Sequence, residues 1–124
     1  MQLYASSDEY MYNLECLTSN EAKKKWKTSI KEAWNNSCAY CGNTHNLTLD
    51  HITSRAKGGT DRITNILCAC NSCNRSKGHQ YWVDWYRSQK FYTQDRLAKI
   101  IEWQKQIAEN ELMVYRPRKI NIDF

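Results

Sequence analysis

The alternation of apolar and polar residues predicts a long amphipathic helix in the first third of the chain. Between about Ser19 and Asn35, apolar side chains recur at helical intervals, and Thr18 with Glu21 forms a capping box at the start. The buried face is expected to consist of Ala22, Trp26, Ile30, Ala33 and Trp34. Lysines cover the other sides. Because glutamates lie nearby, we favour a solvated face for these lysines over a ridge that binds DNA.

Two further helices are predicted after residue 80. The first carries an aromatic stripe at helical spacing, which consists of Tyr81, Trp82, Trp85 and Tyr86. Such a stripe is more often core than a platform for stacked bases, so we expect it to pack against the centre of the chain. After a break, Thr93 can cap a last helix from Gln94 to about Leu112. The apolar face of that helix is expected to contain Leu97, Ile100, Ile101, Ile107 and Ala108, with Trp103 beside it.

Shorter elements are predicted between these helices. Residues 47–52 are rich in apolar and β-branched side chains, which favours a short strand that carries Asp50 and His51. Neighbouring side chains of a strand face opposite ways, so these two are expected on opposite faces. The elements that follow are expected to be a loop over 53–64, a second strand over 65–69 and a helix over 70–77. The pattern predicts an α+β fold with a small central unit.

Four of the six cysteines have the spacing of a structural zinc site. The pairs are Cys38 with Cys41 and Cys70 with Cys73, and together they supply the four thiolates of a tetrahedral Zn²⁺ site. The second pair falls on the predicted helix at positions i and i+3, which share one face. The 28 residues between the pairs exceed the roughly 15–20 of simple four-cysteine sites. An additional segment is therefore expected between the two halves of the site.

The remaining thiols and the N-terminal sequence indicate the cellular compartment in which the protein is expected. Cys16 and Cys68 are expected to be buried free thiols, with a slipped ligand set that uses Cys68 as an alternative. The N-terminus has neither a basic start nor an apolar run, so no signal peptide and no membrane span are expected. Together with cysteines in metal-site spacing, this predicts a cytoplasmic protein, in a bacterial or phage-infected host cell.

The net charge of +5 is concentrated on and after the cysteine-rich centre. Residues 1–37 are neutral because five lysines balance five acids, whereas residues 38–80 carry a net +3 and residues 81–124 a net +2. This placement suits a phosphate backbone that docks at the centre. At 124 residues the chain is expected to form one compact domain, with a metal ion that compensates for a modest core.

The order of residues in the centre resembles the HNH endonuclease motif, the zinc-bound form of the ββα-metal fold. The resemblance rests on Cys-x-x-Cys, Asp-His-Ile, Lys-Gly-Gly-Thr-Asp, Asn-Ile-Leu, Cys-x-x-Cys-Asn and Lys-Gly. At Ser54 the family often has proline, and we expect a looser loop without loss of chemistry. The resemblance implies a zinc core over 38–78, preceded by a leader and helix over 1–37 and followed by helices and a basic tail over 79–124.

The same resemblance implies a metal-dependent DNA endonuclease similar to small phage or mobile-element homing enzymes. His51 would be the base that activates water, and Asp50 and Asn74 would hold a catalytic Mg²⁺ or Mn²⁺. Thiolates are too soft for these ions, so zinc is expected to be structural. Asn65 would orient His51 or pin the adjacent loop. The family places base and metal ligand at adjacent positions, which reconciles one site with the opposite faces that strand periodicity predicts.

Double-stranded DNA is the expected partner, with no membrane and no small-molecule cofactor. The candidate phosphate contacts are Arg55, Lys57, Arg75 and Lys77. One such site cuts one strand at a time, so a double-strand break would require a homodimer or two successive nicks. Homing, restriction and nicking roles all stay open, and the alternative is a non-catalytic, zinc-stabilised DNA-binding module. The complete set of Asp50, His51 and Asn74 favours the enzyme, because a binding module does not need it.

Overall fold

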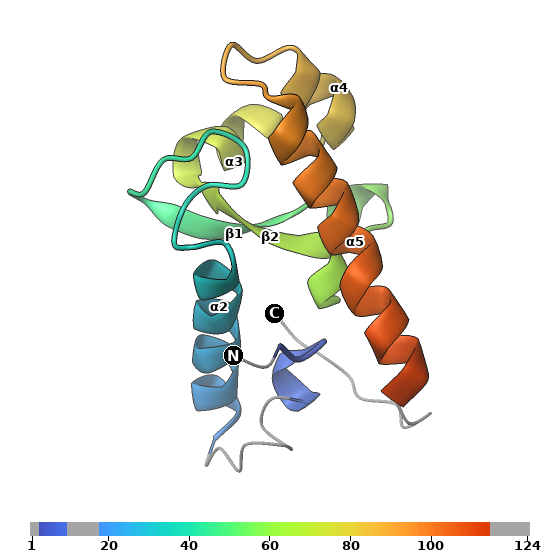
Figure 1. Ribbon diagram of the computed structural model, residues 1–124. Helices are drawn as coiled ribbons and strands as arrows, with labels where there is room; N and C mark the ends of the chain where they lie inside the picture. Colours follow the sequence, from blue (N-terminus) through green and yellow to red (C-terminus); the bar gives the residue numbers. More distant parts are fainter. Residues whose placement is uncertain (1–2, 10–17, 115–124) are drawn as a thin grey trace.

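The computed structural model describes residues 3–9 and 18–114, with side chains up to residue 105. In order, its elements are α2 (Ser19–Ala33), β1 (Leu47–His51), the 3-10 turns η1 (Arg55–Lys57) and η2 (Ile63–Asn65), β2 (Ile66–Cys70), α3 (Asn71–Lys77), α4 (Trp82–Arg87) and α5 (Gln94–Val114). The strands form a two-stranded antiparallel sheet, with α2 and α3 on different sides of it and α5 across its end (Figure 1). This arrangement confirms the predicted α+β fold.

Helix α2 begins where its capping signal predicts. Thr18 Oγ1 accepts a hydrogen bond of 3.0 Å from the backbone N–H of Glu21. The buried side chains of the predicted apolar face are Ala22, Trp26, Ile30 and Trp34, whereas Ala33 is half-buried. The helix ends two residues before the predicted boundary. Asn35 and Asn36 have φ values of 57° and 51°, in the left-handed region that asparagine tolerates.

The two strands and α3 form a ββα unit. In the sheet, Leu47 lies opposite Cys70 and His51 lies opposite Ile66. Every residue of β2 is buried, which agrees with its continuous run of apolar side chains and cysteines. Helix α3 follows β2 directly, with Cys70 as its N-cap residue. This geometry places the last residues of β1 beside α3, where the resemblance predicts the functional side chains.

The segment between the strands is more ordered than the predicted loop, because it contains η1 and η2. It closes tightly on itself at Gly59, where an added Cβ would collide with the carbonyl oxygen of Thr53. Only glycine fits at this position. Ser54 has a φ of −63°, so serine here keeps the backbone conformation that proline would impose.

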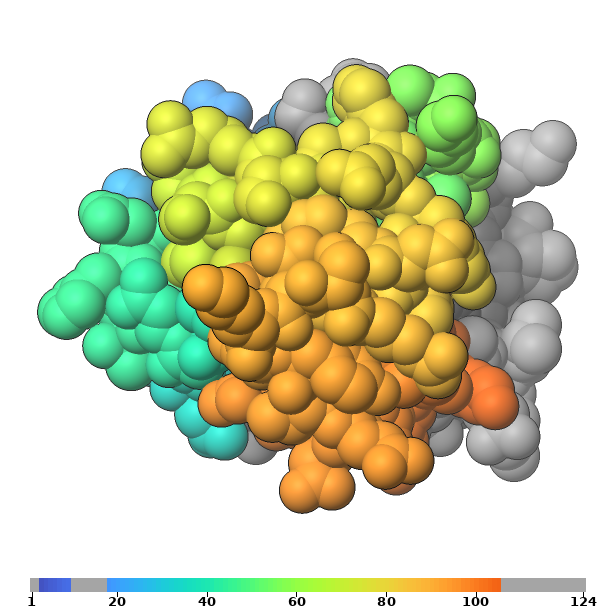
Figure 2. Space-filling model, turned by 90° about the horizontal axis from the view of Figure 1, so that it is seen from above, coloured from blue at the N-terminus to red at the C-terminus, as the bar shows by residue number. Residues whose placement is uncertain are grey.

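Helix α4 covers the cysteine-bearing turn with aromatic side chains. Trp82, Trp85 and Tyr86 are buried, which confirms the predicted packing role, but Tyr81 is 64% exposed and lies outside the core. The ring of Trp85 meets that of Tyr40 edge to face, with centroids 5.0 Å apart. Figure 2 shows the face that α4 and the first turns of α5 form, with α3 at its edge.

Helix α5 packs on η2 and the start of β2. Thr93 Oγ1 accepts a hydrogen bond of 3.2 Å from the backbone N–H of Arg96, as the predicted cap requires. Trp103 Nε1 donates to the carbonyl oxygens of Ile63 and Ile66, at 3.0 and 2.8 Å. The buried side chains of its apolar face are Leu97 and Ile100, whereas Ile101 and Trp103 are half-buried. The predictions for the side chains of Ile107 and Ala108 lie outside the described side chains.

Residues 3–9 pack against this framework. Trp26 Nε1 donates to the carbonyl oxygen of Tyr4 at 2.8 Å, and the N–H of Ile63 donates to that of Ala5 at 3.1 Å. The predictions for Cys16 and the basic tail fall outside the described residues. Among the helices that the structure describes, none has the length and apolar character of a membrane span.

Candidate active site and metal centre

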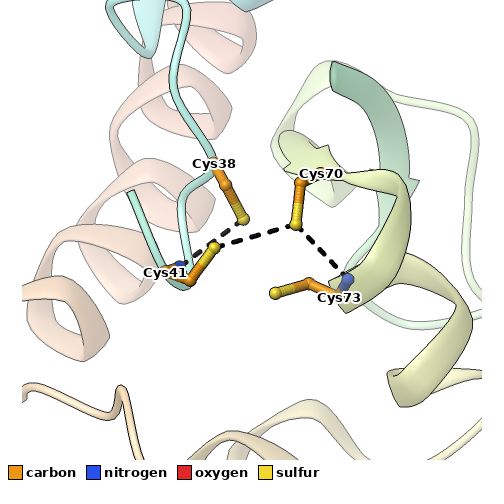
Figure 3. Close-up of side chains that lie close together, drawn as sticks. All are labelled: Cys38, Cys41, Cys70 and Cys73. Carbon is orange, nitrogen blue, oxygen red and sulfur yellow. Dashed lines mark hydrogen bonds between the residues drawn. The ribbon is translucent and has the colours of Figure 1, made fainter. Parts of the chain in front are cut away.

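Four cysteine side chains from two separate segments meet at one point (Figure 3). The sulfur atoms of Cys38, Cys41, Cys70 and Cys73 all lie within 4.8 Å of one another. The sulfurs of Cys41 and Cys70 are 3.7 Å apart. A tetrahedron with Zn–S bonds of about 2.3 Å has sulfur–sulfur edges of about 3.8 Å. The cluster therefore has the geometry of a tetrahedral metal site, as the cysteine spacing predicts.

The electrostatics of these sulfurs favours a cation among them. A hydrogen bond from the Cys73 thiol lowers the pKa of Cys38 to about 4. Burial, and then the negative charge of Cys38, raise the pKa of Cys41 to about 11. The thiols thus obstruct one another's ionisation, whereas a divalent cation would stabilise all four as thiolates. Cys68 is buried outside the cluster, so the alternative ligand set that uses it is not formed.

A second feature is a hollow of about 400 Å³ at the end of β1, which we call the β1–α3 hollow. Its lining includes Asp50 and His51 from β1, Arg55 from η1, Asn74 from α3 and the following His79. Three of the four predicted catalytic residues therefore line one cavity. His79 joins them from a position to which the sequence assigned no role.

Asp50 lies at the buried side of the hollow and is only 5% exposed. The hydroxyl of Tyr40 donates to its Oδ2 at 2.9 Å, and Lys77 Nζ lies 3.2 and 3.3 Å from its two oxygens. Burial raises the pKa of Asp50, and the charge of Lys77 and the bond from Tyr40 oppose that rise. A carboxylate has about four acceptor positions, so these bonds leave capacity for a cation.

The position of Lys77 corrects a prediction. The sequence suggested that this lysine contacts DNA, but its side chain is 1% exposed and its Nζ donates to the carbonyl oxygen of His51 at 2.8 Å. Lys77 follows Cys70 by seven residues and Cys73 by four, which places all three on one helical face. That face points inward, because two of its members, Cys70 and Cys73, belong to the cluster of four cysteines. Arg75 and Lys57 are exposed, so both stay accessible to the phosphates that they are predicted to contact.

His51 is half-buried and pairs with an acid from the loop. Its Nε2 lies 2.9 Å from Oδ1 of Asp61, which also accepts a 2.8 Å hydrogen bond from Arg55 Nε. Burial acts to raise the pKa of Asp61, but the bonds from Arg55 and His51 outweigh it and hold that pKa below its usual value. An ionised carboxylate only accepts hydrogen bonds, so Nε2 of His51 carries a proton.

The side chain of Asn65 holds the loop between the strands in place. Its Oδ1 accepts from the N–H of Thr53 at 2.9 Å, and its Nδ2 donates to the carbonyl oxygens of Thr53 and Thr60 at 2.9 and 2.8 Å. Of the two roles that the sequence offered, the contacts match the second. These bonds close the segment that carries Arg55 and Asp61 towards His51.

Asn74 is half-buried on the side of α3 that faces β1. Its Nδ2 donates to the carbonyl oxygen of Leu49 at 3.3 Å. This bond fixes the side chain beside Asp50 and commits the amide nitrogen. The amide oxygen is then the atom of Asn74 that can serve as a ligand for a hard cation.

The cysteine cluster and the β1–α3 hollow both lie in a segment that known proteins share. The sequence profile of the HNH endonucleases matches residues 38–86, which contain both features. The chain belongs to the HNH endonuclease family. Outside the profile match lie α2 and α5, so the family segment accounts for the site and these two helices frame it.

Three relatives of this family member are longer than the segment they share with it. YoqL, a protein of the SPbeta prophage of Bacillus subtilis (strain 168) named for an HNH endonuclease, is 34% identical over 103 residues, which cover 68% of this chain and 42% of YoqL. The CRISPR-associated endonuclease Cas9 of Corynebacterium diphtheriae is 34% identical over 67 residues, 51% of this chain and 6% of Cas9. Cas9 of Actinomyces naeslundii is 32% identical over 76 residues, 56% of this chain and 7% of Cas9. The chain thus spans less than half of each relative.

Besides His79, two residues at the site had no predicted role. Asp61 belongs to the Lys-Gly-Gly-Thr-Asp stretch that carries part of the resemblance, so its position in the motif was a signal for a role. Tyr40 lies inside the first Cys-x-x-Cys pair, and only the fold shows that its hydroxyl reaches Asp50. Both act through long-range contacts, which residue spacing does not reveal.

Proposed function

We propose that this HNH family member hydrolyses phosphodiester bonds of double-stranded DNA with the help of a divalent metal ion. The observation that carries the proposal is the β1–α3 hollow, which gathers Asp50, His51 and Asn74. Hydrolysis needs a base for the attacking water and oxygen ligands for a hard cation. A histidine, a carboxylate and an amide supply these three groups. Family membership supports nuclease chemistry of this kind.

In this proposal His51 is the general base. Because Asp61 accepts a hydrogen bond from the N–H of Nε2, the lone pair of the imidazole lies on Nδ1, and Nδ1 takes the proton from the attacking water. Asp61 also holds the ring in one orientation, and Arg55 holds Asp61. These contacts reduce the freedom of the base before the substrate binds, which lowers the cost of reaching the reactive geometry.

Two kinds of metal ion fit two kinds of ligand. The four thiolates would hold Zn²⁺ in a closed, structural site, since no coordination position remains for water. Asp50 and the amide oxygen of Asn74 would hold Mg²⁺ or Mn²⁺, which prefer oxygen ligands. That ion would polarise the scissile phosphate and stabilise the leaving oxygen. Tyr40 and Lys77 would keep Asp50 oriented towards the hollow.

The biological setting is proposed from the relatives and the size of the site. A prophage-derived relative favours a phage or mobile-element setting, with homing, restriction or nicking as the roles to be distinguished. One hollow per chain cuts one strand at a time, so cleavage of both strands would require a homodimer or two nicks. Arg55, Lys57 and Arg75 are the exposed cations near the site that would contact phosphates. We place the protein in the cytoplasm, where DNA and reduced thiols occur together.

Removal of the proposed metal ligand on α3 tests the assignment. In a supercoiled-plasmid assay with Mg²⁺ or Mn²⁺, the wild type should yield nicked or linear DNA, and EDTA should abolish the product. Asn74→Ala should lower the rate by on the order of 100-fold, because the cation loses one protein ligand, with little change in DNA affinity. The control is Asn71→Ala, an exposed asparagine on the same helix.

Two results would contradict the proposal. Parallel collapse of DNA binding and cleavage in Asn74→Ala would show that this residue is not a metal ligand. DNA binding without cleavage by the wild type, on plasmid and on DNA of the source organism and its phages, would favour the non-catalytic binding module.

A further inference from the structure

A second hollow, also of about 400 Å³, lies between α2 and the outer side of β1. We call it the α2–β1 groove. Its lining includes Lys27 and Lys31 from α2, Leu47 and Leu49 from β1, and Arg55. His51 lines this groove as well as the β1–α3 hollow, and so do Leu49 and Arg55. The two hollows therefore meet at the proposed general base.

The charge of the groove suits a polyanion. Lys27, Lys31 and Arg55 are its cations, and no aspartate or glutamate is among the described residues that line it. Asp61, whose Oδ1 binds Arg55 and His51, is not among the residues that line the groove. Leu47, Leu49 and Ile66 are the apolar residues of its lining. A lining that combines cations with apolar side chains suits a sugar–phosphate backbone, which alternates anionic phosphates with largely apolar deoxyriboses.

The lysines of α2 divide into two groups. Lys23, Lys27 and Lys31 recur every four residues, so they form one stripe, and all three are half-buried. The helix sequence places no acid three or four residues from any of them. Like charges at this spacing cost helix stability, by roughly 0.2–0.5 kcal/mol per pair. The spacing of charges within α2 therefore does not account for the stripe, and an anionic ligand in the groove would.

The remaining lysines of α2 have a simpler explanation. Lys24 and Lys25 are exposed, and they follow Glu21 by three and four residues, the spacing of stabilising ion pairs. Neither lines the groove. Of the two interpretations of the lysine run, the solvated face thus fits Lys24 and Lys25, and the structure separates Lys27 and Lys31 from them.

We infer that the α2–β1 groove binds the DNA backbone beside the scissile phosphate, with Lys27 and Lys31 as phosphate contacts. The inference rests on the proposed function, because it takes the scissile phosphate to lie at His51. One strand would run from the β1–α3 hollow, past His51 and Arg55, into the groove along α2. Helix α2 lies outside the family profile match, so this contact would be additional to any that the profile segment makes.

Paired lysine variants test the groove. The zinc-loaded full chain is titrated with fluorescent duplex DNA over a range of salt concentrations, in buffer without added divalent cation so that no cleavage occurs. Lys27→Gln with Lys31→Gln should weaken binding by on the order of 10-fold, and the slope of log K against log salt should fall by roughly one per lysine. Lys24→Gln with Lys25→Gln is the matched control, since it removes the same charge from the same helix and should cost less than about 3-fold.

Folding is controlled by charge-conserving variants. Lys27→Arg with Lys31→Arg should bind within about 3-fold of the wild type, because arginine retains the phosphate contact. Circular dichroism and the Tm identify any unfolded variant, and glutamine has nearly the helix propensity of lysine. If the glutamine pair fails to fold, the single variants Lys27→Gln and Lys31→Gln replace it, each with half of the expected slope change.

Three outcomes would overturn the inference: equal losses in both glutamine pairs, no loss in the Lys27–Lys31 pair, or no DNA binding by the wild type. Cleavage of plasmid by the same proteins with Mg²⁺ separates this inference from the proposed function. If the wild type cleaves plasmid and the Lys27–Lys31 glutamine pair binds DNA as the wild type does, the nuclease function stands and the groove is refuted as a binding site. If the Lys27–Lys31 glutamine pair alone loses DNA binding and the wild type does not cleave, DNA binding by the groove stands and the nuclease function is refuted.

Discussion

At the scale of single residues, Asp50 and Lys77 form a buried ion pair on which the site depends. Both side chains are at least 95% buried, and their charged atoms lie 3.2 Å apart. The pair loses hydration on both sides, so its net contribution to stability is small compared with the cost of breaking it. Tyr40 adds a third contact: burial, and then the charge of Asp50, raise the pKa of its hydroxyl well above the usual value, so it stays a donor.

Lys77→Met should therefore destabilise the protein without removing a DNA contact. The substitution leaves Asp50 buried and without its cation, and breaking one side of such a pair costs about 3–5 kcal/mol. Urea unfolding at pH 7 measures the change. The exposed Arg75→Met on the same helix serves as control and should cost less than about 0.5 kcal/mol. An unfolding free energy within about 1 kcal/mol of the wild type for Lys77→Met would show that the pair is not needed for the fold.

Residue spacing predicted which side chains gather at the site better than it predicted their neighbours. The four cysteines meet as their two short spacings predict, and Asp50, His51 and Asn74 line one hollow, as the motif order predicts. Lys77 was misassigned because positive charge suggested a surface, although its spacing from the cysteines placed it on the buried face. Asp61 lies ten residues from His51 in sequence, and only the closed loop brings the two together.

At the scale of elements, the cluster of four cysteines joins the turn before β1 to the start of α3. The backbone supports the same junction, because the N–H of Ala39 donates to the carbonyl oxygen of Cys68 and that of Asn71 to Asn46, both at 2.8 Å. A two-stranded sheet alone is only marginally stable in water. The cluster and the aromatic contacts of α4 therefore hold the ββα unit in place.

Cys41→Ser should unfold this junction. Structural zinc binding is coupled to folding, so loss of one thiolate should remove the metal and lower the Tm by at least about 10 °C. Metal analysis and thermal unfolding are the measurements. Cys68→Ala is the control, since this buried thiol lies outside the cluster and the variant should keep one zinc per chain. A zinc-free Cys41→Ser protein with an unchanged Tm would refute the structural role.

Element types were predictable from the sequence, whereas some boundaries and one loop were not. Apolar and cysteine spacing placed α2, β1, β2, α3, α4 and α5 within a few residues, whereas the helical turn over residues 7–9 was not predicted. The end of α2 was predicted two residues too late, because apolar spacing does not reveal that Asn35 and Asn36 adopt the left-handed conformation. The loop over 53–64 proved ordered, since Asn65 and Gly59 close it through contacts that involve Thr53.

At the scale of the whole molecule, a shared core is framed by helices that the family profile does not cover. The core over 38–86 holds both the cluster of four cysteines and the β1–α3 hollow. Helix α2 adds a lysine stripe beside one end of β1, and α5 fastens η2 and β2 through Trp103. The domain organisation into leader, zinc core and C-terminal helices stays a prediction, although residues 3–9 pack on the core. In the proposed function, the core supplies the groups for hydrolysis, and α2 beside it supplies contacts to the DNA backbone.

Single-turnover cleavage of supercoiled plasmid by the wild type and His51→Ala tests most directly whether His51 is the general base. With Mg²⁺, loss of a general base should slow cleavage by about 10²–10⁴-fold while DNA affinity changes little. His45 is an exposed loop histidine that does not line the hollow, so His45→Ala should cleave at the rate of the wild type. Cleavage by His51→Ala within a few-fold of the wild type would show that His51 is not the base and that the β1–α3 hollow is not the catalytic centre.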